Sequence, residues 1–219
     1  MGIKRNVLLV STLKAALSSI IVKYTNDLTI KISNDVDEIK TFCHSSIENK
    51  ILISYNTNII IAKEDFEKCE NSFNIHSASP SFPGRDPHHW AKYVGATSYG
   101  ATLHYMTDKV DNGPIVKVHR FSIDSTDTPS SILHKANLEA FKLLDYILSE
   151  LTTFTEIQVD PNEQWNTKKY KRADLVNICD VTDLVDPVEF DLRVTSFYTE
   201  KHPNLYLKKF DQTFYLKLS

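Results

Sequence analysis

The sequence predicts an α/β protein whose Rossmann-like, mostly parallel sheet is flanked by helices and followed by a short C-terminal extension. Two segments, 5–11 and 50–54, each contain a continuous apolar run, which is typical of strands covered on both faces. Segments with helical spacing of apolar residues separate the predicted strands, and this alternation favours a parallel sheet. The 219 residues suffice for one full-size domain with a small appendage.

The first half of the chain alternates strands and helices as far as a proline-rich segment. We expect strands at 5–11, 28–32, 50–54, 73–76, 99–106 and 115–121. We expect helices from residue 12 to residue 17, at 35–42 and at 63–70. The segment 77–90 carries three prolines and one glycine and is predicted to be a loop. A turn is expected at 108–114.

The second half begins with a clear helix start. Thr128 is an N-cap residue and Pro129 follows at the first helical position, so a helix is predicted from there to about residue 151. Further on, 186–192 reads as a short helix, and 204–207 with 213–218 as a C-terminal hairpin. We therefore divide the chain into a main domain, 1–155, and an extension, 156–219.

Charge and cysteine content exclude several classes of function. The formal net charge is −3, so the chain lacks the dense basic surface that binds nucleic acid. Cys43, Cys69 and Cys179 are far apart and odd in number, which indicates free thiols in a reducing cytoplasm rather than a zinc site or disulfides. The apolar run at 7–10 is too short for a signal peptide, and no stretch is long enough to span a membrane. We expect a cytoplasmic protein.

The chemistry lies in Asn74-x-His76 and in the later Asp111-x-Gly113. Two residues apart on a strand, the Asn74 and His76 side chains point to the same side. The amide can donate to an oxyanion, the imidazole titrates near neutral pH, and Asp111 can orient that imidazole. Alone, the polar pair would be read as a turn cap and Asp-Asn-Gly as an ordinary turn. Their joint occurrence favours an acyl-transfer site.

Other polar residues have weaker signals. Adjacent histidines on an extended segment point apart, so His88 and His89 do not suggest a metal site, and no metal is expected. We expect them, with Trp90, to lie near the substrate, although Trp90 also reads as a packing anchor. His104 lies within a predicted strand and reads as a structural histidine. The basic run 168–172 could face a diphosphate or be simply solvated.

These motifs resemble the folate-dependent formyltransferases, which include glycinamide ribonucleotide, methionyl-tRNA and amino-sugar N-formyltransferases. The resemblance rests on Phe73–Ser77, Pro83-Gly84, Gly100–His104 and Val110–Val116, and it is strongest over about residues 50–120. It implies that Asn74, His76 and Asp111 are catalytic. It also implies that 1–155 is the catalytic domain and that 10-formyltetrahydrofolate is the co-substrate. The loops that match its binding site are Asn58, Ile59, Ile60, Thr107, Asp108, Lys109 and Val110.

Departures from the family's pattern reduce the number of amines that could accept the formyl group. The segment after the first strand, Ser11–Ala15, lacks the glycine-rich turn that holds the phosphate of glycinamide ribonucleotide. The tail is too short and the chain too acidic for a tRNA substrate. Residues 165–175 and the final hairpin resemble the extension of sugar N-formyltransferases. The resemblance thus implies a dTDP-, UDP- or GDP-linked amino sugar and a role in lipopolysaccharide O-antigen biosynthesis.

Alternatives remain open from sequence. The same chemistry could act on another small amine, such as glycinamide ribonucleotide. The chain could instead hydrolyse the formyl folate, or bind folate or a sugar nucleotide without catalysis. A homodimer is a further expectation, because a short hairpin has edges to cover.

Overall fold

The computed structural model describes residues 4–199 and 204–217. One sheet of six strands has the order β2-β1-β3-β4-β5-β6. Its strands are β1 Arg5–Val10, β2 Leu28–Ser33, β3 Lys50–Tyr55, β4 Asn71–His76, β5 Ser98–Tyr105 and β6 Ile115–Ser122. The first four strands are parallel, whereas β5 is antiparallel to β4 and to β6. The predicted α/β class with a mostly parallel sheet is confirmed.

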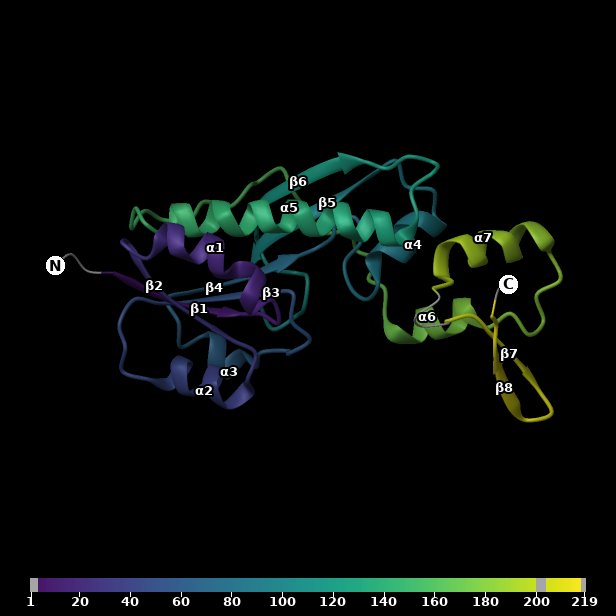
Figure 1. The fold of residues 1–219 in the computed structure, drawn as a ribbon, viewed down its shortest axis with the longest axis horizontal. Helices are drawn as coiled ribbons and strands as arrows, with labels where there is room; N and C mark the ends of the chain where they lie inside the picture. The colour runs from purple at the N-terminus through teal and green to yellow at the C-terminus, as the bar shows by residue number, and fades with distance from the viewer. Residues whose placement is uncertain (1–3, 200–203, 218–219) are drawn as a thin grey trace.

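Helices cover both faces of this sheet (Figure 1). The first face carries α1 Lys14–Tyr24 and α5 Pro129–Glu150, and the opposite face carries α2 Val36–His44 and α3 Lys63–Phe66. Each face buries its own apolar cluster, which explains why β1 and β3 read as continuous apolar runs. The helix α5 starts as predicted, because Thr128 and Ser131 form a reciprocal capping box.

The remaining elements lie at one end of the sheet (Figure 1). They are α4 Pro87–Tyr93, α6 Arg172–Cys179, α7 Pro187–Phe197 and the hairpin of β7 Tyr206–Lys209 with β8 Gln212–Tyr215. A third apolar cluster joins both parts of the chain: Trp90 and Ala136 of the main part pack with Tyr170 and Phe197 of the extension. The C-terminal hairpin is confirmed, and the division of domains after residue 155 stays a prediction.

Several predicted boundaries were wrong. The segment 77–90 is not all loop, since Asp86 adopts a left-handed conformation with φ 52° and Pro87 then begins helix α4. The helix predicted at 63–70 ends at Phe66, and the one predicted at 186–192 continues to Phe197. Helix α6 was not predicted. The second strand of the hairpin ends at Tyr215, and residue 218 of the predicted strand lies outside the described residues.

Within the described part of the chain, no helix is both long and apolar enough to cross a membrane. The same residues contain no group of three or more His, Cys, Asp or Glu side chains placed to hold a metal ion.

Candidate active site

The pairing of β4 with β5 sets the geometry of the site. This is where the sheet changes from parallel to antiparallel pairing, and the register places Asn74 opposite His104. Asn74 Nδ2 lies 3.0 Å from His104 Nε2. Side chains that face each other across paired strands are close enough to interact directly, so the two residues form one unit.

His104 fixes the orientation of the Asn74 amide. The His104 ring is buried, and burial lowers the pKa of this histidine to about 4, so the ring is neutral near pH 7. Its Nδ1 lies 2.8 Å from the carbonyl oxygen of Tyr105, which can only accept, so Nδ1 carries the proton. The bare Nε2 therefore accepts from the Asn74 amide. The second N–H of that amide remains available for a ligand.

Asp111 approaches the same place from the loop between β5 and β6. The carboxylate is buried, and its Oδ2 accepts a hydrogen bond of 2.9 Å from the backbone N–H of Gly84. Its Oδ1 lies 3.7 Å from His76 Nδ1 and 3.9 Å from His104 Nε2. Asp111 also has a φ of 47°, a left-handed conformation that non-glycine residues adopt at a cost and often at functional sites.

His76 lies half-buried at the end of β4, where both ring nitrogens face acceptors. Nε2 is 3.3 Å from the carbonyl oxygen of Phe82, and Nδ1 faces Asp111. The ring therefore lies between a carbonyl oxygen on one side and the Asp111 carboxylate on the other. The structure thus brings Asn74, His76 and Asp111 together, with an amide donor and a titratable ring side by side.

These three residues form one wall of a cavity of about 630 Å³. This volume lies within the range of small-molecule sites. All the residues expected at the folate site line it: Asn58, Ile59, Ile60, Thr107, Asp108, Lys109 and Val110. Ile61, Phe66 and Met106, which belong to one apolar cluster, also line it.

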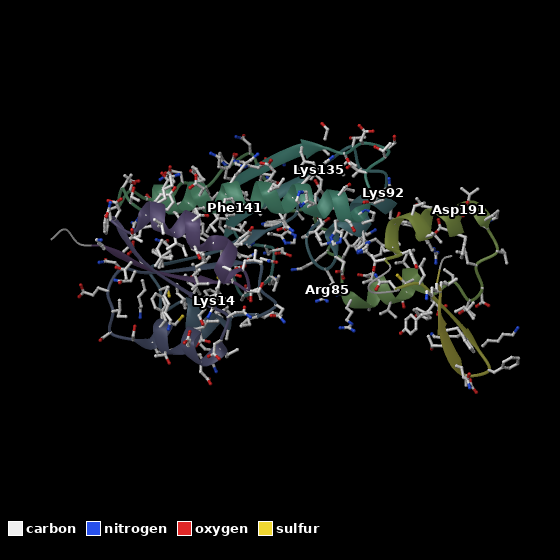
Figure 2. The ribbon with its side chains drawn as sticks, in the orientation of Figure 1. Lys14, Arg85, Lys92, Lys135, Phe141 and Asp191 are labelled. Carbon is white, nitrogen blue, oxygen red and sulfur yellow. The ribbon has the colours of Figure 1, made fainter. Side chains whose placement is uncertain are left out.

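The predicted substrate residues lie elsewhere. His88 and His89 are on helix α4, not on a loop, and line a second, larger cavity of about 1490 Å³. Trp90 lines neither cavity; its ring stacks on Tyr170 with centroids 4.3 Å apart, as expected of a packing anchor. Arg85 lines both cavities, and Figure 2 shows it between the sheet and the C-terminal elements.

Two residues at the site were not assigned a part in it from sequence. His104 was read as structural, yet it holds the Asn74 amide. Trp165 belongs to the extension, and its indole Nε1 donates to the carbonyl oxygen of Gly113 at 2.8 Å. Neither partner is a sequence neighbour, so no local pattern reveals these contacts.

Known proteins are similar to this chain in sequence and in fold. Residues 44–145 match the formyl transferase family. The bifunctional polymyxin resistance protein ArnA of Wigglesworthia glossinidia brevipalpis is 28% identical over 131 residues, which are 58% of this chain and 20% of that protein. The match thus spans only about a fifth of the curated relative.

Solved structures match almost the whole chain. A sugar N-formyltransferase of Shewanella sp. FDAARGOS_354 superposes with a TM-score of 0.77 at 19% identity, over 98% of this chain and 97% of its own. The N-formyltransferase of Helicobacter canadensis, solved with folinic acid and dTDP-3-aminofucose, has a TM-score of 0.69 at 16% identity, over 95% and 85%. At these identities the likeness concerns the fold. Over residues 44–145, the chain is similar to the formyl transferase family.

Proposed function

We propose that this protein transfers the formyl group of 10-formyltetrahydrofolate to the amine of a nucleotide-linked amino sugar. The observation that carries the proposal is the convergence of Asn74, His76 and Asp111 on one wall of the first cavity. An amide donor, a titratable ring and a buried carboxylate are what formyl transfer to an amine requires.

The chemistry proceeds through a tetrahedral intermediate. The neutral amine of the acceptor attacks the formyl carbon, and the Asn74 N–H that His104 leaves free donates to the developing oxyanion. His76 stabilises the same oxygen through its Nε2 side, which gives up its long contact with the Phe82 carbonyl oxygen. Asp111 orients the His76 ring and balances its charge, while its own position is fixed by Gly84. The amine proton then moves to the folate nitrogen that leaves, directly or through water.

The formyl donor would occupy the first cavity. The two loops that line it, 58–60 and 107–110, present backbone N–H and C=O groups that can bind a pterin ring, as the family resemblance implies. The Helicobacter canadensis relative was solved with a folate, folinic acid, which supports a folate at this site.

The nucleotide part of the acceptor would occupy the second cavity. Arg85, Arg172 and Lys208 line it with His88 and His89, and guanidinium and ammonium groups bind phosphate oxygens. Because Arg85 lines both cavities, a diphosphate beside it would leave the sugar amine near Asp111. Trp90 does not line this cavity, and a part for it in substrate binding stays a prediction.

We further propose that the protein works in the cytoplasm as a homodimer, within O-antigen biosynthesis. The hairpin exposes Phe210, Phe214 and Tyr215, an apolar surface that a second copy would cover. Light scattering of the wild-type protein and of Phe210→Ser tests the dimer. A monomeric wild type would refute this part alone.

The activity is tested with 10-formyltetrahydrofolate and a panel of dTDP-, UDP- and GDP-linked amino sugars, with product detected by mass spectrometry. Glycinamide ribonucleotide forms a separate arm. We expect formylation of at least one amino sugar and its loss in Asn74→Ala. Turnover of glycinamide ribonucleotide alone would replace the proposed acceptor, and no turnover with any amine would refute the transferase.

A further inference from the structure

One short segment of the extension lies across the active site. We call residues 165–170 the strap. It runs between the end of the main domain and helix α6, and it makes hydrogen bonds to two separate loops. One is the loop that follows β4, and the other joins β5 to β6, which carries Asp111.

The first edge of the strap holds the loop after β4. The Asn166 backbone N–H donates to Pro80 O at 2.9 Å, and the Tyr170 N–H donates to Pro83 O at 3.1 Å. The Tyr170 carbonyl in turn accepts from the Arg85 N–H at 2.9 Å. These bonds fix the backbone on both sides of Gly84.

Gly84 shows how closely the strap approaches this loop. A Cβ on Gly84 would lie 2.2 Å from the Tyr170 carbonyl oxygen, and Gly84 has a φ of 103°. The N–H of this same glycine holds Asp111 Oδ2. The strap therefore fixes the donor that positions the carboxylate.

The second edge of the strap holds the loop of Asp111 itself. The Lys169 ammonium donates to the carbonyl oxygen of Val110, one residue before Asp111. The Trp165 indole N–H donates to the carbonyl oxygen of Gly113, two residues after it. Asp111 thus lies between two backbone carbonyls that the strap holds.

The Trp165 ring also packs on the two histidines of the site. Its centroid lies 5.0 Å from that of His104, edge to face at 86°, and 6.1 Å from that of His76, tilted by 55°. Both separations fall within the range of favourable aromatic contacts. Trp165 is therefore in ring contact with both histidines and hydrogen-bonded to the loop of Asp111.

We propose that Trp165 is a positioning residue of the active site, which fixes the His76 ring and the Asp111 loop in one arrangement. The expected effect on turnover rests on the proposed function. The positioning of the His76 ring and the Asp111 loop by Trp165 does not depend on which substrate is bound. Small displacements of catalytic groups lower turnover steeply. The binding of the formyl donor and of the acceptor depends instead on the residues that line the first and the second cavity.

The test compares Trp165→Phe, which keeps a ring but loses the indole N–H, with Trp165→Leu, which loses both. Tyr24→Phe is the matched control, because it removes a ring-borne hydrogen bond between α1 and Asp145 of α5. We expect kcat to fall about 10-fold in the first variant and about 100-fold in the second, with KM for both substrates within about twofold. Tyr24→Phe should retain kcat.

A second measurement needs no substrate. Histidine ring nitrogens are followed by ¹⁵N NMR in the wild type and the three variants, alongside thermal unfolding. We expect the His76 and His104 signals to shift in both Trp165 variants and to stay in place in Tyr24→Phe. Unchanged histidine signals in Trp165→Leu would overturn the proposal, even if stability and activity fell.

The two measurements separate this inference from the proposed function. If no amine is formylated by the wild type, the proposed function fails and the NMR comparison still decides the role of Trp165. If the wild type is active and Trp165→Phe keeps full kcat and unshifted histidine signals, the positioning role is refuted and the function stands.

Discussion

The buried His104 makes folding stability depend on pH in a predictable direction. Its pKa is about 4 in the folded protein, lowered by burial, against about 6.5 in an unfolded chain. Between these values the unfolded state binds more protons, so stability falls as the pH drops from about 6.5 to about 4 and changes no further below that. From pH 7.5 to pH 5, this one group should cost about 2 kcal/mol.

His104→Gln isolates that contribution. Glutamine does not titrate, so the variant loses the pH-dependent contribution of residue 104 to folding stability. Its amide oxygen can still accept from Asn74, so the Asn74 amide keeps a hydrogen-bond partner. Urea unfolding at pH 7.5 and pH 5 gives the fall in stability for each protein. We expect the wild type to lose about 2 kcal/mol more than the variant between these two pH values. Equal losses would refute the assignment of a buried neutral imidazole.

Three further predictions concern the site and its supports. Asp111→Asn should lower kcat by at least about 100-fold in a protein that unfolds at nearly the same temperature, and near-normal turnover would exclude its proposed role. Gly84→Ala should lower both activity and melting temperature, because its Cβ would clash with the Tyr170 carbonyl oxygen; a melting temperature equal to wild type would contradict the close approach. Thr128→Ala removes the cap shared with Ser131 and should cost about 1 kcal/mol in urea unfolding; an unchanged free energy of unfolding would contradict the capping role.

Strong periodic signals made most of the fold predictable. The apolar runs of β1 and β3 and the capped start of α5 were recognisable because burial on two faces and N-capping leave local patterns. Helix α4 was missed because three prolines mask it: Pro87 is compatible with a first turn, but only once Asp86 takes a left-handed conformation. The backbone N–H of the neighbouring Arg85 donates to the Tyr170 carbonyl oxygen, a contact that local sequence does not reveal.

Part of the candidate site was likewise predictable from local sequence, and part was not. Asn74 and His76 share one strand, so their common direction follows from the pleat of the strand. The contribution of Trp165 depends on a connection that returns across the sheet end to Gly113, 52 residues away in sequence. His104 was read as a structural histidine, but its bond to Asn74 depends on the antiparallel register of β4 and β5. Long-range pairing of this kind has no local signature.

That register also constrains how such a protein can change. A shift of one residue between β4 and β5 would turn the His104 side chain to the other face of the sheet and leave the Asn74 amide without its acceptor. An exchange of segments between related enzymes would therefore need to move the two strands together. The walls of the second cavity come mostly from other elements, namely α4, the start of α5, α6, α7 and the hairpin, so they can diverge independently of β4 and β5. A new acceptor could thus be acquired at one end of the molecule while the chemistry is inherited intact at the other.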